Sequence, residues 1–156
     1  MKTVIIGGVA GGASAAARLR RLDEKAEIII LERGEFVSFA NCGLPYYIGG
    51  SITDKKDLTL QTPQSFKARF NIDVRVFNEA VKISPDTKTV TVKNLHTGEI
   101  YNESYGNLVL SPGAEPIKPN IDGINGDRVF TLRNIPDTVK IKSYIEAANP
   151  KSAVVI

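Results

Sequence analysis

The pattern of strand, glycine turn, helix and strand in residues 2–33 constrains the fold more than any other feature of this sequence. Residues 2–7, "KTVIIG", form an apolar, β-branched run that ends on glycine, as a buried parallel strand does. The next segment, "GASAAARLRRLDE", is rich in the helix formers Ala, Leu and Arg, and "AEIIILER" at 26–33 is a second apolar run. Such a unit predicts two parallel strands that are joined by a crossover helix.

The rest of the chain extends this pattern of alternating helices and strands. Thr62-Pro63 predicts the start of a short helix, and Pro136 opens a last helix that Asn149-Pro150 ends. Residues 73–104 alternate apolar and polar side chains around the turns "SPDTK" and "NLHTGE", which predicts a three-stranded antiparallel meander with one face in water. Residues 107–116, "NLVLSPGAEP", predict a buried strand and then a Pro/Gly-rich loop.

These elements predict one α/β domain over residues 1–150, with a parallel sheet and an antiparallel β-meander inserted at about 73–104. The last six residues, "KSAVVI", read as the start of another buried parallel strand. Such a strand is normally followed by a helix. We therefore expect residues 151–156 to begin a further domain, so that this chain is a truncated part of a longer protein.

Composition and charge exclude several classes of function. Twenty Lys and Arg residues against 17 Asp and Glu residues leave a net charge of +3, and no basic run interleaves with aromatic residues, which argues against nucleic-acid binding. The apolar N-terminus is broken by glycines, unlike a signal peptide, and no stretch approaches the ~20 apolar residues that cross a membrane. One cysteine excludes a disulfide scaffold and indicates a cytoplasmic, reducing compartment. No cluster of ligands predicts a metal site.

The glycine-rich turn after the first strand predicts a dinucleotide site. Gly7 permits the tight turn and Gly12 lets helix and strand approach, whereas Val9 stands where the usual fingerprint has its middle glycine. The phosphates would therefore be held by backbone amides at the helix N-terminus, where the helix dipole favours anions. Glu32 lies twenty residues beyond Gly12, the spacing at which a carboxylate accepts hydrogen bonds from ribose hydroxyls. The alternative is a plain tight turn with a solvated strand end.

The second candidate site is Cys42, the only cysteine, in "VSFANCGLPYYIGG" at 37–50. A free cysteine is most often a small buried hydrophobe. Cys42, however, follows a strand and precedes an expected short helix, and a helix N-terminus favours the thiolate form of a thiol. Because the chain has no second cysteine, a redox cycle needs an external sulfur, a sulfenate or an electron-donating cofactor. A nucleotide fold together with a reactive thiol points to a flavin.

Four segments carry a resemblance to a known family: "IIGGVAGGASAAARLRRLD", "ERGEFVSFANCGLPYYIGG", "LVLSPGAEP" and "TLRNIPD". In this order they resemble the single-cysteine branch of the FAD-dependent pyridine nucleotide-disulfide oxidoreductases, and "SFANCGLPYYIGG" is the most specific part. The branch includes coenzyme A-disulfide reductases, NADH oxidases, NADH peroxidases and persulfide reductases. The resemblance implies a Rossmann-like FAD-binding domain whose N-terminal part is residues 1–150, with the start of an NAD(P)H-binding domain at 151–156.

The resemblance also implies roles for individual residues. Cys42 would be the redox nucleophile, and Ser38 and Asn41 would line the same pocket. The "SPGAEP" loop departs from the family's T-G-A-x-P pattern, and its proline removes a backbone donor. The residues implied to hold FAD, with Val81 meeting the adenine through its backbone, are Gly7, Gly8, Val9, Ala10, Gly11, Gly12, Glu32, Arg33, Val81, Ser111, Pro112, Gly113 and Arg133.

The first helix carries a candidate substrate surface. Ser14, Arg18 and Arg21 are spaced i, i+4 and i+7 and so share one helix face. The resemblance implies that this face contacts coenzyme A, and guanidinium groups suit phosphates. The alternative is a solvated basic helix face, and Arg69 in the following helix could extend the patch.

The remaining candidates receive no catalytic role. His96 lies in an expected hairpin turn without an acidic partner, and Tyr46 and Tyr47 read equally well as packing aromatics.

The resemblance implies that the whole protein passes a hydride from NAD(P)H to FAD and electrons to the sulfur of Cys42, whose thiolate attacks a small-molecule disulfide or persulfide. A coenzyme A-disulfide or persulfide reductase is the first interpretation, and the whole protein is expected to be a homodimer. An NADH oxidase or peroxidase that uses a Cys42 sulfenate is one alternative. The other is a noncatalytic truncated fold fragment, and we expect this chain alone to be inactive.

Overall fold

The computed structural model describes residues 1–156 and divides the chain into two compact units, each built from two separate segments. Unit 1 contains Met1–Phe39 and Thr59–Gly113, and unit 2 contains Ala40–Leu58 and Ala114–Ile156. Each unit is described by itself.

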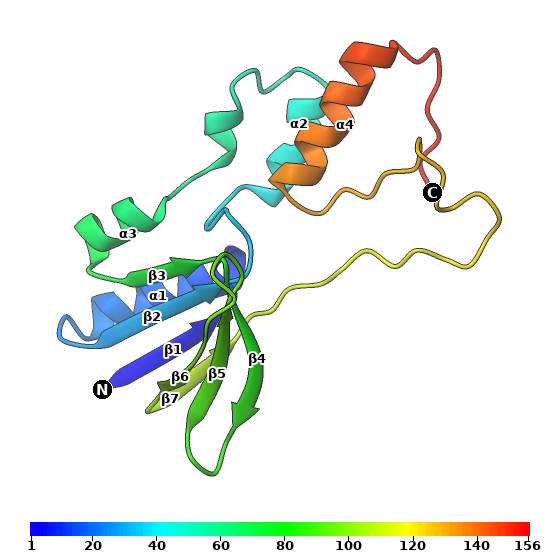
Figure 1. The fold of residues 1–156 in the computed structure, drawn as a ribbon. Helices are drawn as coiled ribbons and strands as arrows, with labels where there is room; N and C mark the ends of the chain where they lie inside the picture. The colour runs from blue at the N-terminus through cyan, green and yellow to red at the C-terminus, as the bar shows by residue number, and fades with distance from the viewer. The chain divides into compact units, whose positions relative to one another are not determined.

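Unit 1 is built on a four-stranded parallel sheet with strand order β3-β2-β1-β7 (Figure 1). The strands are β1 (Lys2–Ile6), β2 (Glu27–Glu32), β3 (Asp73–Val76) and β7 (Asn107–Leu110). The two central strands are β1 and β2, and both are largely buried. Burial on both faces explains why their sequences are nearly continuous apolar runs rather than alternating ones. The predicted pair of parallel strands joined by a helix is confirmed.

One face of this sheet is covered by α1 (Ala10–Leu22) and α3 (Pro63–Phe70). The small residues Ala13 and Ala16 of α1 are buried and pack with Ile5, Ile28 and Ile30 of the two central strands. The predicted start of α3 is confirmed, because Thr62 and Ser65 form a reciprocal capping box and Pro63 follows the cap. Phe66 of α3 is buried in the same apolar cluster. The side of the sheet on which the helices lie thus has a single continuous core.

The other face of the sheet packs against a three-stranded antiparallel meander, β4 (Asn78–Ser84), β5 (Thr89–Asn94) and β6 (Ile100–Ser104). Val4 of β1 and Ile29 and Leu31 of β2 point to this side of the sheet. Each is adjacent in sequence to a residue that points to the helices. They pack against Val90 and Val92 of β5. The strand period of two therefore gives the sheet two separate apolar layers.

The predicted extent of the meander, about 73–104, is wrong at its start. Residues 73–76 form β3, which pairs in parallel with β2, and the meander begins at Asn78. As the edge strand, β3 has one neighbour and all four of its residues are only half-buried. A half-buried edge strand alternates apolar and polar residues as a meander strand does, so its sequence did not reveal its partner.

Unit 2 contains the thiol segment and the last helix. The thiol segment forms a 3₁₀ turn η1 (Asn41–Gly43), then α2 (Leu44–Ile48) and a second turn η2 (Lys55–Leu58). The last helix, α4 (Ile135–Ala148), has its N-cap at Asn134 and ends at Asn149 in a left-handed conformation. The helix predicted from Pro136 to Asn149 is confirmed, and it starts one residue earlier. Residues 153–156 are exposed and belong to no strand. The expected further strand there stays a prediction.

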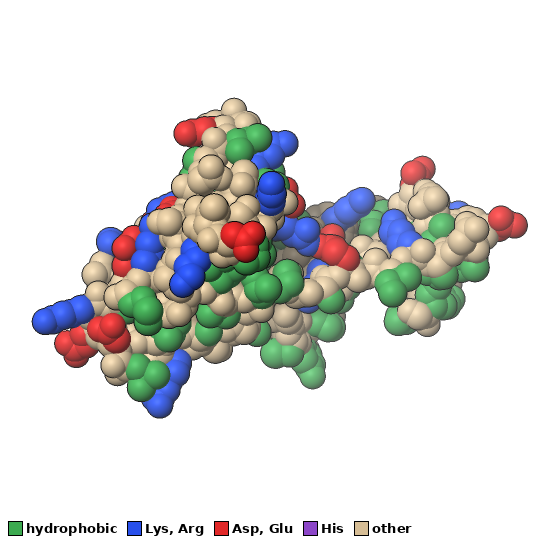
Figure 2. Space-filling view, turned by 90° about the horizontal axis from the view of Figure 1, so that it is seen from below, with side chains coloured by type: hydrophobic (Ala, Val, Ile, Leu, Met, Phe, Trp, Pro, Cys, Tyr) green, Lys and Arg blue, Asp and Glu red, His purple; other side chains and the backbone are tan.

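On the face seen in Figure 2, basic and acidic side chains are interspersed rather than gathered by sign. No helix in the structure has the length and apolar character needed to span a membrane.

Candidate functional site

The glycine turn between β1 and α1 brings three backbone segments into contact. Gly7 has a φ of +92°, and a Cβ there would lie 1.9 Å from the carbonyl oxygen of Ser111. A Cβ on Gly12 would lie 1.8 Å from the carbonyl oxygen of Gly7. The expected roles of the two residues, a tight turn at Gly7 and close helix–strand packing at Gly12, are therefore visible in the geometry.

The N-terminus of α1 has no side chain that satisfies its first amide groups. Its N-cap residue is Val9, which makes no side-chain capping bond, and the first turn contains no acidic residue. The first N–H groups of a helix have no partner within the helix, and they carry the positive end of its dipole. Ala10 and Gly11 of this first turn are exposed. This thirteen-residue helix therefore begins with N–H donors that no side chain caps and that suit an anionic group.

Glu32 lies at the end of β2 beside this turn, and it is about nine-tenths buried. Its Oε2 accepts a hydrogen bond of 2.8 Å from the backbone N–H of Gly8, and its Oε1 accepts one of 2.7 Å from the N–H of Gly34. Each carboxylate oxygen can accept more than one hydrogen bond. Glu32 is thus fixed by the two backbone donors and retains acceptor capacity.

The loop after β2 crosses the glycine turn at Ser38. The N–H of Ser38 donates to the carbonyl of Gly8 at 2.9 Å, and its own carbonyl accepts from the N–H of Leu60 at 2.9 Å. Ser38 has a φ of +50°, a conformation that non-glycine residues seldom adopt. The structure therefore brings Ser38 against the glycine turn by backbone bonds on both sides.

Two further candidate contacts in unit 1 lie at irregular backbone. The ladder between β4 and β5 shifts register between Ala80 and Lys82, which leaves Val81 at a bulge with about half of its side chain exposed. Ser111 follows β7, and its N–H donates to the carbonyl of Ile6 at 2.8 Å. Pro112 and Gly113 are exposed after it. A bulge residue is left out of the strand ladder, so the backbone of Val81 can bond elsewhere.

The thiol lies in unit 2, in the turn η1 that leads into α2. Cys42 is a free, exposed cysteine, and the neighbouring Asn41 is exposed as well. Gly43 is buried against Leu58 and Ile52, with a Cβ position 3.1 Å and 3.3 Å from their side chains. The burial of Gly43 anchors the turn while Cys42 stays accessible to a reagent in solution. The alternative of a buried, purely structural cysteine does not match this exposure.

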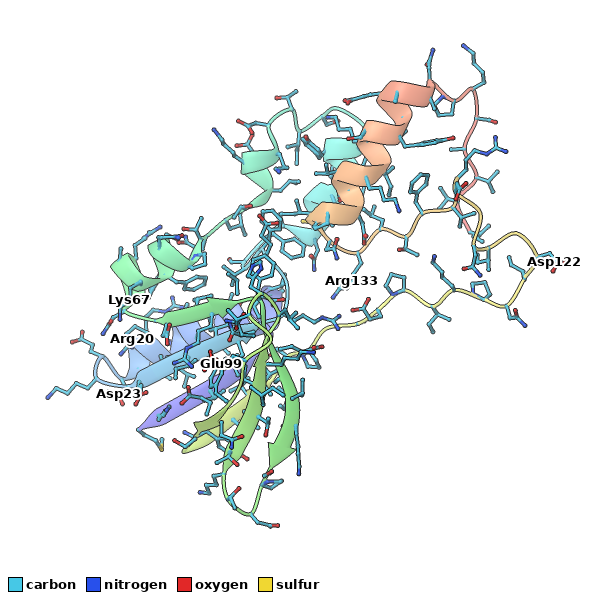
Figure 3. All side chains as sticks on the ribbon, viewed as in Figure 1. Arg20, Asp23, Lys67, Glu99, Asp122 and Arg133 are labelled. Atoms are coloured by element: carbon cyan, nitrogen blue, oxygen red, sulfur yellow. The ribbon has the colours of Figure 1, made fainter.

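The other residues predicted to contact ligands divide between the two units. Ser14, Arg18 and Arg21 are all exposed on α1, as expected for one helix face. Arg33 is exposed after β2. Arg133, in unit 2, donates from Nε to the carbonyl of Ala114 at 2.7 Å, and Figure 3 shows it before the start of α4.

Two residues near the candidate nucleotide site were not identified from the sequence. Gly34 donates to Glu32, and its carbonyl accepts from the N–H of Phe77 at 3.2 Å. A glycine two residues after the strand-end acid is a signal that could have found Gly34. Phe77 gives no such signal, because its partners, Gly34 and the adjacent Leu95 and His96, come from two distant segments of the chain.

The ionisable groups with shifted pKa values lie between the sheet and the meander rather than at these sites. Burial alone would raise the pKa of Glu103 on β6, but hydrogen bonds from Lys2 and Arg75 outweigh it and hold that pKa below its usual value. The hydrogen bond to Glu103 raises the pKa of Lys2. This network joins β1, β3 and β6 and is structural. No group of three His, Cys, Asp or Glu side chains lies together in a way that could hold a metal ion.

The chain is similar to known proteins over nearly its whole length. The family model described as pyridine nucleotide-disulphide oxidoreductase matches residues 1–156. Coenzyme A disulfide reductase of Staphylococcus haemolyticus is 43% identical over 155 residues, which are 99% of this chain and 34% of that protein. The chain thus spans about a third of the length of the curated relatives it matches.

Solved structures give the same relationship. The reduced CoADR-RHD of Bacillus anthracis is 59% identical with a TM-score of 0.93, over 96% of this chain and 27% of that chain. An NAD-dependent persulfide reductase from A. fulgidus is 37% identical with a TM-score of 0.90, over 94% of this chain and 28% of that chain.

Proposed function

The chain belongs to the pyridine nucleotide-disulphide oxidoreductase family, and we propose that it is the N-terminal, FAD-binding part of a coenzyme A-disulfide or persulfide reductase. Residues 1–150 would belong to the FAD-binding domain, and residues 151–156 would begin the NAD(P)H-binding domain. The family implies flavin and pyridine-nucleotide cofactors. The observation that carries the proposal is the uncapped N-terminus of α1 beside the buried carboxylate of Glu32, in a chain whose only cysteine is exposed.

The residues of the glycine turn fit the ADP half of FAD. The free amides at the start of α1 would hold the pyrophosphate, although Val9 replaces the usual middle glycine. The remaining acceptor capacity of Glu32 suits the two ribose hydroxyls. The bulge at Val81 supports a backbone contact to adenine. Further contacts are proposed for Gly7, Gly8, Ala10, Gly11, Gly12, Arg33, Ser111, Pro112, Gly113 and Arg133.

Cys42 would be the nucleophile, and bound FAD would supply the electrons that NAD(P)H donates. The Cys42 thiolate attacks one sulfur of coenzyme A disulfide, the S–S bond breaks, and one coenzyme A thiolate leaves. Cys42 is then joined to the other half in a mixed disulfide. Two electrons reduce that bond and return the Cys42 thiolate and a second coenzyme A thiolate. With a persulfide substrate, Cys42 would instead take the outer sulfur and release the substrate's thiolate.

The substrate side would be formed by exposed residues. Ser38 and Asn41 shortly precede Cys42 in the sequence and would line its pocket, and Ser14, Arg18 and Arg21 would bind the phosphates of coenzyme A from α1. Arginine is suited to phosphates because its planar guanidinium makes two parallel charge-assisted hydrogen bonds.

The thiol chemistry can be tested on this chain without any cofactor. Incubation with coenzyme A disulfide should add one coenzyme A to the protein mass, and Cys42→Ser should remove the adduct. Replacing both Arg18 and Arg21 by Ala should slow the reaction with coenzyme A disulfide about tenfold, as expected for lost charge-assisted bonds. The same double variant should react normally with oxidised 2-mercaptoethanol, which lacks phosphates. Equal slowing with both disulfides would contradict the phosphate role.

Cofactor binding and turnover need separate measurements. Titration of the chain with FAD, followed by quenching of flavin fluorescence, should saturate, and Glu32→Ala should weaken binding. In the longer protein, Cys42→Ser should abolish NADH-dependent reduction of coenzyme A disulfide and leave the flavin bound. Undiminished turnover would refute the role of Cys42. Rapid oxygen consumption without disulfide turnover would instead favour an oxidase with a Cys42 sulfenate, and failure to bind FAD would favour a noncatalytic fragment.

A further inference from the structure

Phe77 has an unusual backbone conformation for an aromatic residue. Its φ is +56°, which is a genuine outlier for a bulky aromatic residue. Asn71 and Asn149 also have positive φ, but each ends a helix, where a left-handed residue is common. Phe77 ends no helix and lies in no hairpin turn. It is the single residue between β3 of the parallel sheet and β4 of the meander. Such strain persists where the surroundings fix it, and it is often found at functional sites.

The backbone of Phe77 is fixed on both sides. Its N–H donates to the carbonyl of Gly34 at 3.2 Å, and its carbonyl accepts from the N–H of Leu95 at 2.8 Å. Leu95 belongs to the turn between β5 and β6, which lies at the carboxyl end of β3 in Figure 1. These two hydrogen bonds fix the β3–β4 connection at Phe77. One joins it to the loop that follows β2, and the other joins it to the β5–β6 turn.

The bond to Gly34 continues to the candidate nucleotide site. The N–H of Gly34 donates to Oε1 of Glu32 at 2.7 Å, while Oε2 of the same carboxylate accepts from Gly8 at 2.8 Å. Three consecutive hydrogen bonds therefore lead from Phe77 to the glycine turn. A shift of Phe77 would move the peptide that fixes one oxygen of Glu32.

The ring of Phe77 is held by His96. The two ring centroids are 3.9 Å apart, with the planes tilted by 55°. His96 is exposed, and its backbone N–H donates to Oδ1 of Asn94 at 2.9 Å, which fixes its place in the β5–β6 turn. The histidine thus covers the ring of the strained residue from the solvent side.

We propose that Phe77, clamped by His96, is a positioning residue for the ribose-binding carboxylate of Glu32. The inference rests on the role proposed for Glu32 in FAD binding. Phe77 does not contact the nucleotide in this proposal. It acts through Gly34. The meander therefore helps to position Glu32, in addition to packing against the sheet.

The test compares Phe77→Ala and His96→Ala with the conservative variants Phe77→Tyr and His96→Phe, which keep the two rings in contact. Lys88→Gly is the matched control, because Lys88 also has a positive φ of +48° but lies in the β4–β5 turn. The readouts are the affinity of the 156-residue chain for ADP by calorimetry, the hydrogen-exchange rates of the Gly34 and Gly8 amides by NMR, and the urea midpoint.

We expect both Ala variants to weaken ADP binding and to accelerate exchange at Gly34 by about three- to tenfold, as for a lost hydrogen bond. Phe77→Tyr, His96→Phe and Lys88→Gly should stay close to wild type in both measurements. A lower urea midpoint with unchanged Gly34 exchange and ADP affinity would show that Phe77 merely joins two sheets, and would overturn the proposal. If Phe77→Ala does not fold, His96→Ala decides, since His96 is exposed. If the wild-type chain does not bind ADP, the FAD role fails, while exchange at Gly34 still decides whether Phe77 positions this loop.

Discussion

At the scale of single residues, the glycine turn depends on close backbone contacts at Gly7 and Gly12 that leave no room for a Cβ atom. The roles of Gly7 and Gly12 follow from their order after an apolar strand, because only a residue without a side chain permits such close approach. The spacing to Glu32 predicted an acceptor at the strand end. Its bonds to Gly8 and Gly34 could not be predicted, because they depend on how the loop after β2 folds back.

The clearest residue-scale prediction concerns Gly12. In Gly12→Ala the new methyl group would lie 1.8 Å from the backbone oxygen of Gly7, which cannot move without opening the turn. We expect a loss of about 3 kcal/mol in the free energy of unfolding, the upper end for overpacking. Gly11→Ala is the control, because its methyl group would meet only the side chain of Ser111, at 3.1 Å from Oγ and 3.5 Å from Cβ, and no backbone atom. Urea denaturation of both variants checks the difference, and equal stabilities would contradict the close-approach role.

At the scale of secondary structure, the local sequence predicted the helices and strands. It did not predict every pairing between strands. The cap at Thr62 satisfies a helix end with neighbouring residues, so it could be predicted from the sequence, as could the start of α4 near Pro136. The edge strand β3 was assigned to the meander, because its half-buried residues do not reveal which sheet it joins. The role of Phe77 as the connection between the two sheets could not be predicted for the same reason.

The side chain of Arg20 makes hydrogen bonds to the C-terminal ends of two helices, α1 and α3. Its guanidinium donates to the carbonyls of Phe70 at 2.7 Å and Asn71 at 2.9 Å, at the end of α3, and to those of Asp23 at 3.2 Å and Glu24 at 2.6 Å, after α1. Figure 3 shows Arg20 and Asp23 at this end of unit 1.

Arg20→Met should therefore lower the free energy of unfolding by about 1–3 kcal/mol, since bonds from a charged donor are lost. Arg21→Met is the matched control, because Arg21 is exposed and donates only to the carbonyl of Ala17 at 3.3 Å. Its stability should change by no more than about 0.5 kcal/mol. Chemical denaturation measures the free energy of unfolding of both variants. An unchanged value for Arg20→Met would show that hydrogen bonds to water replace these bonds without loss of stability.

In unit 2, a lysine of α4 holds the short helix that follows the thiol turn. Nζ of Lys142 donates to the carbonyl of Tyr47 at 3.0 Å and lies 3.9 Å from the centroid of its ring. A five-residue helix is not stable alone, so α2 depends on such contacts. Lys142→Met should accelerate hydrogen exchange in α2 about tenfold, as for a lost charged bond. Lys140→Met, on the same helix, should leave the exchange in α2 unchanged. Equal acceleration by the two substitutions would contradict a specific role of Lys142 in stabilising α2.

At the scale of the whole molecule, the two units are each assembled from separate segments of the chain. The glycine turn and Glu32 lie in unit 1, whereas Cys42 and Arg133 lie in unit 2. Sequence order suggested one domain over residues 1–150, because consecutive elements gave no signal of the division. Only Phe39 and Ala40 separate Ser38 of unit 1 from Asn41 of unit 2 along the chain. The thiol segment therefore starts directly from the loop that crosses the glycine turn.

Within unit 1, one ionic network connects the parallel sheet to the meander. Glu103 of β6 accepts from Nζ of Lys2 on β1 and, at 2.5 Å, from the guanidinium of Arg75 on β3. Arg75 also bonds to Asp73 at 2.9 Å. Both cations favour the ionised form of Glu103, so its pKa is lower in the folded chain than in the unfolded one, despite its burial.

The stability that this network contributes depends on pH at both ends of the scale. A depressed carboxyl pKa contributes stability that is present above the unfolded value, here 4.5, and is lost as the pH falls through the lower folded value. Lys2 acts at the opposite end: its raised pKa contributes stability below 10.5 that is lost as the pH rises beyond it. The network should thus weaken in acid below about pH 4.5 and again in strong base.

Glu103→Gln should remove the acid part of this dependence. We expect the variant to be less stable than wild type at neutral pH, because Lys2 and Arg75 lose their charged partner, and the difference between the two proteins to shrink as the pH falls below about 4.5. Urea denaturation across this range measures the difference, which cancels the titration of the other carboxyl groups. Glu99→Gln, in the exposed β5–β6 turn, should show no such convergence. A constant difference between wild type and Glu103→Gln at every pH would mean that Glu103 contributes packing rather than charge to the junction of the two sheets.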